Sequence, residues 1–355
     1  MHRLASLLRL GLAPEVAQPH KALSQFKEED MIIQDSLHGG AYESEGTGTG
    51  AQVVVLGSLH LDIVVRASDR PRKGETLPGS SWGFRAGGKG GNQAVAAAQF
   101  GARTSMVGRV GDDDFGGRLL NHLKSAGVGT EHVRTDLEAG SGMSVAIIDA
   151  EGDYGAIIVS GANLRLSNED LEEARDIIRN ARVLVLQNEV PEAANVAAAK
   201  LARGSGVRVV LNAAPARPLG PDLAANIDLL VVNAVEAEML CGLTVASLRA
   251  ATEAAAILSN RVASVVVTAG GFGLAMAARG KTQCAEAAHS VKLIDTHGAG
   301  DLFIGALAAR WASGTPLREA VRFANAAAAL FVSTPPDRKK FITSDQVICF
   351  LSECR

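Results

Sequence analysis

The chain has 355 residues, of which 47% are hydrophobic and only 4% aromatic, so Ala, Val, Leu and Ile must form most of its core. This composition favours helices packed closely on a sheet over an aromatic-rich β-sandwich. The formal net charge of −3 at pH 7 implies no strongly basic face, which argues against nucleic acid as the main ligand. The four cysteines contain no C-x-x-C pair and the eight histidines no H-x-x-x-H spacing, so a zinc site has no support.

The first segment, residues 1–51, lacks sustained periodicity and ends in Gly/Thr-rich sequence typical of flexible linkers. Its first 12 residues contain two arginines and no acid, which is compatible with a mitochondrial or plastid transit peptide as well as with a flexible extension. Few, scattered cysteines suit a reducing compartment, so we expect a cytoplasmic protein, with organelle import as the alternative. No apolar run reaches the roughly 18 residues that a membrane span needs.

From Gln52 onward, short β-branched runs alternate with Ala-rich helical stretches. The expected strands are 53–56, 105–110, 183–187, 207–211, 229–232 and 265–268. The expected helices are 92–100, 171–180, 193–203 and 248–259. Strands that are apolar throughout and separated by helices indicate a parallel sheet covered on both faces.

Two segments, 62–85 and 142–158, break this alternation and have the pattern of antiparallel strands joined by turns. With their flanking residues they define predicted lid strands at about 60–86 and 141–160. Open α/β sheets bind ligands at the carboxyl ends of their strands, so we expect a small β-sheet lid over that edge.

A glycine-rich segment, residues 87–92, has the sequence Gly-Gly-Lys-Gly-Gly-Asn and precedes a predicted helix. Glycine allows a ligand to approach the backbone closely, and a helix start presents free N–H groups. The segment is not a P-loop, because Gly90 stands where a hydroxyl should hold magnesium. It also lacks the third glycine of a dinucleotide fingerprint. We therefore expect a ligand-binding segment rather than an idle turn.

A second segment, residues 295–301, has the sequence Asp-Thr-His-Gly-Ala-Gly-Asp and leads into an apolar helix predicted at 302–311. The backbone N–H groups of Ala299, Gly300 and Asp301 would form an anion hole with the helix dipole. Phosphoryl transfer needs such a hole. Asp301 would accept a proton from an attacking hydroxyl, although spacing alone favours a helix cap equally.

With both motifs in order, residues 52–331 resemble the ribokinase-like (PfkB) family of carbohydrate and nucleoside kinases. The resemblance implies a three-layer α/β/α core with a mainly parallel sheet, in a domain spanning 52–355, and a β-sheet lid that pairs subunits into a homodimer. It implies ATP-dependent phosphorylation of D-ribose at the 5-hydroxyl, giving D-ribose 5-phosphate and ADP. The alternatives are another sugar, sugar acid or nucleoside as acceptor, or a catalytically weak sugar-binding regulatory protein. The partners would be a small-molecule sugar and ATP, with no nucleic acid or membrane.

The resemblance also assigns roles to individual residues. The catalytic group would comprise the base Asp301 and an anion hole of Gly298, Ala299 and Gly300. The sugar would be bound by His60, Asp62, Gly88, Lys89, Gly90, Gly91, Asn92 and Glu189. The nucleotide would be bound by Asn233, Glu236, Thr268, Gly270, Gly271, Phe272, Gly273, Gly300 and Asn325. Of these, Asn233 and Glu236 would help to order Mg²⁺ and phosphate through water.

Three features depart from the family pattern. His297 stands where a small residue is usual, and with Asp295 it would form a K⁺ site through its main-chain carbonyl. His60 stands where the family often carries Asn, so we expect different contacts to the sugar. Residues 333–341 carry two prolines and three basic residues in place of the loop beside adenine and K⁺, which puts K⁺ activation in question. For residues 338–340 we favour a solvated basic turn over contact with ATP phosphates.

Overall fold

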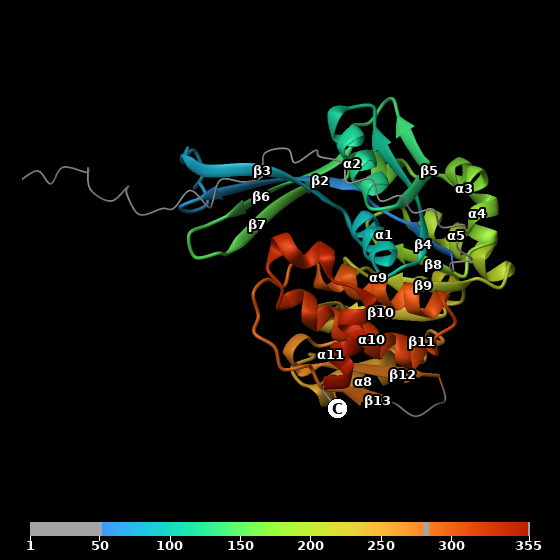
Figure 1. Ribbon diagram of the computed structural model, residues 1–355. Coiled ribbons are helices and arrows are strands. Elements are labelled where there is room, and N and C mark those ends of the chain that lie inside the picture. The colour runs from blue at the N-terminus through green and yellow to red at the C-terminus, as the bar shows by residue number, and fades with distance from the viewer. Residues whose placement is uncertain (1–51, 280–283, 354–355) are drawn as a thin grey trace, which may run out of the picture. The chain divides into compact units, whose positions relative to one another are not determined.

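The computed structural model describes residues 52–279 and 284–353, which belong to one compact unit. The predictions for residues 1–51 lie outside the described part of the chain. Figure 1 shows helices on both sides of a large sheet, and a narrow four-stranded sheet that projects from this body. No described helix combines the length and apolar character needed to cross a membrane.

The large sheet has nine strands in the order β13-β12-β11-β10-β9-β8-β1-β4-β5. All pairs from β11 to β5 are parallel, whereas β12 pairs antiparallel with β11 and with β13. The strands are β1 (Gln52–Leu56), β4 (Arg103–Gly111), β5 (Val128–Asp136), β8 (Val183–Gln187), β9 (Arg208–Asn212), β10 (Leu229–Asn233), β11 (Ser264–Thr268), β12 (Leu274–Ala278) and β13 (Cys284–Glu286).

Successive residues of a strand point to opposite faces, and β1 illustrates how this builds two cores. Val54 and Leu56 join the core on one side, whereas Val53 and Val55 join the core on the other. The first core is covered by α3 (Asn168–Glu173), α4 (Arg175–Arg179), α5 (Glu192–Gly204), α6 (Pro221–Ala224), α7 (Ala234–Cys241) and α8 (Leu248–Ser259). The second is covered by α1 (Lys89–Gln99), α2 (Asp114–Ser125), α9 (Ala299–Ala312), α10 (Leu317–Val332) and α11 (Ser344–Glu353). The predicted three-layer α/β/α class is therefore confirmed.

Helices α1 and α9 pack unusually closely, and this contact positions the site described below. At Gly305 in α9, an added Cβ would lie 2.4 Å from the Cβ of Ala96 in α1. A side chain larger than hydrogen would therefore push the two helices apart. Glycine at this position lets the amino-terminal ends of both helices approach each other.

The projecting sheet has the order β3-β2-β6-β7 and consists of two hairpins. Its strands are β2 (His60–Ala67), β3 (Gly79–Gly87), β6 (Gly142–Ile148) and β7 (Tyr154–Val159). Each hairpin is antiparallel, as predicted, but the hairpins join through a parallel pair, β2 with β6. Hydrogen bonding between segments so far apart in the chain leaves no local sequence signal, so the parallel pairing was missed.

Four other expectations change. The glycine-rich segment is not a loop before a helix, because α1 begins at Lys89 and includes Gly90 and Gly91. The helix predicted at 302–311 begins earlier, at Ala299. The helix predicted at 171–180 is divided into α3 and α4 at Ala174. Strand β5 was not predicted, because it lies at the sheet edge and has a mixed polar pattern.

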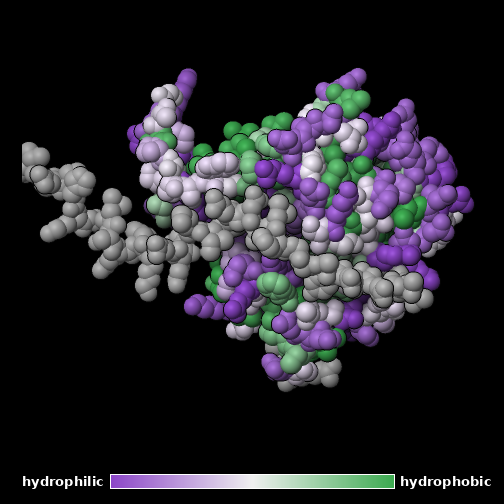
Figure 2. Space-filling view, turned by 45° about the horizontal axis from the view of Figure 1, so that its top comes forward, coloured by the Kyte–Doolittle hydropathy of each residue, from purple (hydrophilic) through white to green (hydrophobic). Residues whose placement is uncertain are grey.

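Figure 2 shows hydrophilic and hydrophobic residues interspersed over the visible surface.

Candidate active site

A cavity of about 370 Å³ lies where the strands of the large sheet end and helices α1 and α9 begin. It is lined by residues just beyond β8, at the ends of β9, β10 and β11, and in lid strands β2, β6 and β7. The carboxyl edge of a parallel sheet is the usual ligand-binding edge of such folds. Of the predicted residues, those that line it are His60, Asp62, Gly88, Lys89, Asn92, Glu189, Asn233, Glu236, Thr268, His297, Gly298, Ala299, Gly300 and Asp301.

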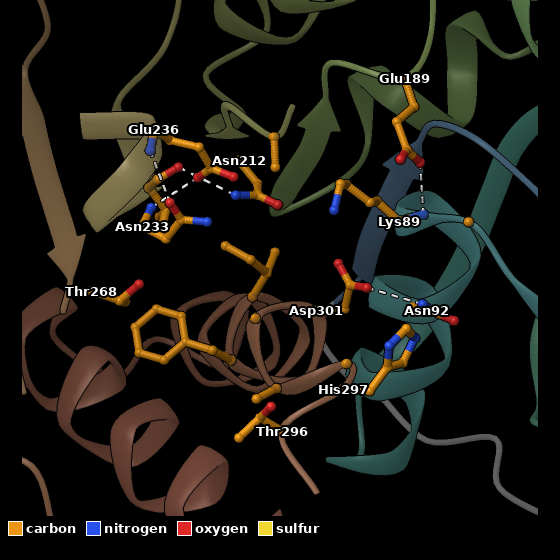
Figure 3. Close-up of a pocket in the computed structure, with 18 of the residues that line it drawn as sticks. Lys89, Asn92, Glu189, Asn212, Asn233, Glu236, Thr268, Thr296, His297 and Asp301 are labelled. Atoms are coloured by element: carbon orange, nitrogen blue, oxygen red, sulfur yellow. Dashed lines mark hydrogen bonds between the residues drawn. The ribbon is translucent and has the colours of Figure 1, made fainter. Parts of the chain in front are cut away.

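Asp301 lies in the first turn of α9, and its carboxylate is held by two amides from α1. Asn92 Nδ2 donates to Oδ2 at 2.9 Å, and Gln93 Nε2 donates to Oδ1 at 2.9 Å. Figure 3 shows the side chain of Lys89 pointing into the pocket near this carboxylate. Burial raises the pKa of Asp301 above its usual value, although Lys89 and the two amides oppose the shift. A carboxylate with a raised pKa and a fixed orientation is suited to accept a proton.

The amino terminus of α9 presents free backbone donors to the same cavity. Gly298 adopts the left-handed conformation at φ 81° and caps the helix. The N–H groups of Gly300 and Asp301 donate to no acceptor among the described residues. Ala299 differs from the expectation, because its N–H donates to the carbonyl of Thr296 at 3.2 Å. Two helix N–H groups, rather than the three expected, are therefore free to bind an anion.

The lid side of the cavity gathers polar groups from three separate segments. Glu189 Oε2 accepts hydrogen bonds from Ser58 Oγ and from the N–H of Lys89, at 2.5 and 3.0 Å. His60 is buried, which lowers the pKa of its imidazole despite the nearby Glu189 and Asp62 carboxylates. Its Nε2 is buried and has no hydrogen-bond partner among the described residues.

Arg85 connects the lid to the body of the molecule, and Asp62 lies next to it within the lid sheet. Asp62 Oδ1 accepts from Ser144 Oγ of β6, and Asp62 Oδ2 lies 3.8 Å from Arg85 Nη2 of β3. Arg85 Nη2 also lies 2.9 Å from Nε2 of His297 in the segment before α9. Partial burial and Arg85 lower the pKa of His297, so at neutral pH the uncharged ring can accept this hydrogen bond. The lid and the segment before α9 (residues 295–298, called the anion-hole segment below) are thus in direct contact.

Two of the glycines assigned to the sugar have a packing role instead of a place in the cavity lining. A Cβ at Gly90 would lie 2.6 Å from the backbone nitrogen of Ser58, and one at Gly91 would lie 2.8 Å from the side chain of Leu59. The N–H of Gly91 donates to the carbonyl of Ser58 at 3.0 Å. Both glycines therefore bring α1 against the segment that follows β1.

The opposite end of the cavity holds the residues predicted to bind the nucleotide. Asn233 and Glu236 form a capping box at the start of α7, with bonds of 2.8 and 2.9 Å. Burial raises the pKa of Glu236, against the hydrogen bond from the N–H of Asn233. Thr268 lies beside them at the end of β11.

The remaining predicted nucleotide residues lie outside the cavity lining. Gly270, Gly271 and Phe272 form a 3₁₀ turn, followed by Gly273 at φ 107°. A Cβ at Gly273 would lie 2.0 Å from the carbonyl oxygen of Glu286, so only glycine fits there. Asn325 lies in α10, and its Nδ2 is buried without a partner among the described residues.

The segment 336–341 contradicts the solvated basic turn that we favoured for residues 338–340. Arg338 and Lys340 are exposed, but Lys339 is only 7% exposed. Its Nζ donates to the carboxylate Oδ2 of Asp295 at 2.7 Å and to the Asp295 main-chain oxygen at 3.0 Å. Although partial burial would raise the pKa of Asp295, the hydrogen bonds from Lys339 and the N–H of His297 lower it.

Residues with supporting roles were missed by sequence reasoning. Gln93 is fully buried, and its Nε2 donates both to Asp301 and to Oδ1 of Asn212, at 2.9 and 3.0 Å. Gln187 in turn donates to Oε1 of Gln93 at 2.8 Å. Asn163, also fully buried, bonds the N–H and the carbonyl of Leu59. Buried amides of this kind carry one signal in a sequence, a polar residue within an apolar run.

Comparison with known proteins agrees with this arrangement. The family model described as pfkB family carbohydrate kinase matches residues 51–341. Ribokinase from Mus musculus is 39% identical over 261 residues, which cover 73% of this chain and 81% of the mouse protein. Ribokinase from Haemophilus influenzae is 33% identical over 300 residues, which cover 84% of this chain and 98% of the bacterial protein.

Among solved structures, ribokinase from Arabidopsis thaliana complexed with ribose and ATP superposes with a TM-score of 0.77. It is 32% identical, and the match covers 85% of this chain and 99% of the plant chain. A family model that spans the sheet, the lid and both motifs, together with relatives that match over most of their length, places this chain in the pfkB family of carbohydrate kinases.

Proposed function

We propose that this protein transfers the γ-phosphoryl group of ATP to the 5-hydroxyl of D-ribose. The observation that carries the proposal is the Asp301 carboxylate, oriented by Asn92 and Gln93 beside the free N–H groups at the start of α9. This arrangement places a base and an anion hole next to each other. The matched ribokinases, one of them complexed with ribose and ATP, indicate the acceptor and the donor.

In the proposed reaction the sugar lies between the lid and Asp301. Asp301 accepts the proton of the 5-hydroxyl while the hydroxyl oxygen forms a bond to the γ-phosphorus. The bond from that phosphorus to the β,γ-bridging oxygen breaks, ADP leaves, and the proton passes from Asp301 to solvent. The N–H groups of Gly300 and Asp301 and the dipole of α9 stabilise charge on the transferring group.

Sugar recognition would rest on the carboxylates at the lid. Asp62 and Glu189 each keep acceptor capacity toward the cavity, because each carboxylate can accept several hydrogen bonds. His60, which lines the cavity beside Glu189, would provide a further contact to the sugar. Contact of Asp62 with β6 and, through Arg85, with the anion-hole segment would couple lid closure to sugar binding and exclude water from the phosphoryl group.

ATP would extend from α9 toward the carboxyl end of β11. The family resemblance places Asn325 beside the adenine; its buried Nδ2 has no partner among the described residues and would donate to the nucleotide. Leaving a buried donor unpaired costs about 1–3 kcal/mol, so a ligand partner there is favoured. The turn from Gly270 to Gly273 would lie beside the same ligand.

Magnesium fits the chemistry of Glu236 and Asn233. Glu236 Oε1 accepts no hydrogen bond from the described residues and belongs to a buried carboxylate in the cavity wall. Mg²⁺ prefers oxygen ligands and retains several waters, so these side chains would hold it through its water shell. When bound, the ion would neutralise charge on the β- and γ-phosphates. No group of three or more His, Cys, Asp or Glu among the described residues forms a dedicated metal cage.

The lid also supports a homodimer. Ile157 and Trp82, from the two edge strands of the lid sheet, are 74% and 69% exposed. Exposed apolar side chains of this size on a small sheet favour pairing with a second copy. Sedimentation velocity should give a dimer for the wild type and a shift toward monomer for Ile157→Glu. Met239→Glu, at an exposed apolar residue of α7, is the matched control and should stay dimeric.

The direct test is ADP release by purified protein with ATP, Mg²⁺ and D-ribose, compared with D-fructose, 2-deoxy-D-ribose and adenosine. The proposal predicts the highest kcat/KM for D-ribose. Turnover of another acceptor alone would correct the substrate, and ribose binding without turnover would contradict the kinase assignment.

A further inference from the structure

Lys339 occupies a site that has the chemistry of a monovalent-cation site. Its Nζ lies 2.7 Å from a carboxylate oxygen and 3.0 Å from a carbonyl oxygen of Asp295, and 4.0 Å from the centroid of the Phe331 ring. A carboxylate, a carbonyl and an aromatic face all attract a cation. A buried position among these three groups therefore requires one positive charge, and the chain supplies it.

The family resemblance implied that Asp295 and the carbonyl of His297 hold K⁺, but the residues present do not fit that ion. The two Asp295 oxygens that point to the site already accept hydrogen bonds from the ammonium group. A K⁺ ion at the same oxygens would stand in contact with Lys339, and two like charges at that distance repel each other strongly in a partly buried site. One cation or the other can be present, and only Lys339 is covalently held there.

Both the main chain and the side chain of Lys339 are held in place. Gln99, at the end of α1, donates from Nε2 to the carbonyls of Lys339 and Ile342 at 3.0 and 2.9 Å. The ammonium end therefore reaches Asp295 from a backbone that is tied to the body of the molecule. Among the described residues, the exposed neighbours Arg338 and Lys340 form no ion pair, and Lys340 lies only over the ring of the exposed Phe341.

Asp295 transmits this constraint to the phosphate-binding end of α9. Its Oδ1 accepts from the N–H of His297 at 2.9 Å, while its own N–H donates to the carbonyl of Val332 at 3.2 Å. Three residues after Asp295, Gly298 adopts its left-handed conformation, and the free N–H groups of Gly300 and Asp301 follow. Rotation of the Asp295 side chain would therefore release the segment that sets the direction of those donors.

We propose that Lys339 is a built-in monovalent cation that holds the segment 295–298 in its anion-binding conformation and makes the protein independent of K⁺. Lys339 is a positioning residue, because it touches neither reactant and acts through Asp295. The proposal rests on the proposed kinase activity only where turnover is the readout.

The experiment compares the wild type with Lys339→Met, which keeps an apolar side chain of similar length but removes the charge. Melting temperature and ADP release are measured in KCl, NH₄Cl and choline chloride at equal ionic strength. We expect both quantities of the wild type to be the same in all three salts. In choline chloride, Lys339→Met should lose roughly 10²-fold in kcat, the size of loss that small misplacements cause. KCl and NH₄Cl should restore much of the loss and raise the melting temperature.

Lys340→Met, an exposed lysine in the same turn, is the matched control and should behave like the wild type in every salt. A wild-type melting temperature or rate that rises with K⁺ over choline would overturn the proposal. So would a Lys339→Met protein that folds but shows no response to K⁺ or NH₄⁺ in either readout. The melting temperature needs no turnover, so it separates failure of this inference from failure of the proposed reaction. If Lys339→Met does not fold, the wild-type salt series decides.

Discussion

The two helices that meet at Asp301 are secured in different ways. On the α1 side, the neutral amides of Asn92, Gln93 and Gln187 form a buried network that reaches the carboxylate directly. On the α9 side, the side chain of Asp295 in the segment before the helix is held by an ion pair with Lys339. An amide network resists changes of salt and pH, whereas an ion pair responds to both. The orientation of the base should therefore be robust, and the anion hole should be sensitive to its surroundings.

The largest effect on the α1 side is expected from Gln93→Leu. This substitution removes one hydrogen bond to Asp301 and leaves the buried amide of Gln187 without its acceptor. An unsatisfied buried donor costs about 1–3 kcal/mol of stability, and loss of base orientation should lower kcat by roughly 10- to 100-fold. Urea unfolding and steady-state kinetics measure the two effects. A Leu variant with unchanged kcat would show that Asn92 alone orients the base.

The contact between the helices can be tested at Gly305. A Cβ there would overlap Ala96, so Gly305→Ala should push α9 away from α1 and cost about 1–3 kcal/mol. The loss should appear in urea unfolding, together with a lower kcat, because Asn92 and Gln93 would reach Asp301 less well. Gly204→Ala, at a helical glycine with open space around its added Cβ, is the control and should change stability by no more than about 1 kcal/mol. Equal stability of the two variants would contradict the close packing.

The charge near the base can be tested through pH. Burial already raises the pKa of Asp301, and Lys89 is the strongest opposing influence. Activity should fall as the pH drops through this raised pKa, because protonated Asp301 cannot accept a proton. Lys89→Met should raise the pKa further and move the acid limb of kcat/KM to higher pH, besides lowering the rate. An acid limb of kcat/KM that stays in place, or moves to lower pH, would show that this limb does not report the ionisation of Asp301.

The smallest effect concerns acid stability on the α9 side. The pKa of Asp295 is lowered in the folded protein, so its ionised form adds stability above the unfolded pKa, and this stability is lost as pH falls through the folded pKa. The free energy of unfolding of Asp295→Asn should therefore be lower than that of the wild type at neutral pH, by about 1 kcal/mol, and the gap should shrink in acid. Asp337→Asn, at an exposed residue of the same turn, should show no gap at either pH.

Local motifs made part of this site predictable. Residues 87–92 and 295–301 each combine a helix start, glycines and a polar side chain within a few positions, so their chemistry is visible in sequence. The strands were predictable for a similar reason, because buried parallel strands are apolar throughout. The polar edge strand β5 and the parallel pairing of β2 with β6 gave no such signal.

The contacts that give the motifs their function were not predictable from spacing. Gln93 and Asp301 are 208 residues apart, Arg85 and His297 are 212 apart, and Lys339 and Asp295 are 44 apart. Lys339 was expected in a solvated turn because residues 338–340 are all basic. The structure shows that Arg338 and Lys340 are exposed, whereas Lys339 is buried. Which lysine turns inward is decided by the position of Asp295 in the folded chain. Local sequence does not encode that position.

The most direct test of the account is Asp301→Asn, which keeps the shape of the side chain but removes its ability to accept a proton. Ribose-dependent ADP release should fall by roughly 10²- to 10⁴-fold, the range that general-base catalysis contributes, while ATP affinity measured by calorimetry should stay near the wild-type value. A variant that retains a near-normal rate would contradict the assignment of Asp301 as the base. Loss of ATP binding together with turnover would instead assign Asp301 to nucleotide binding.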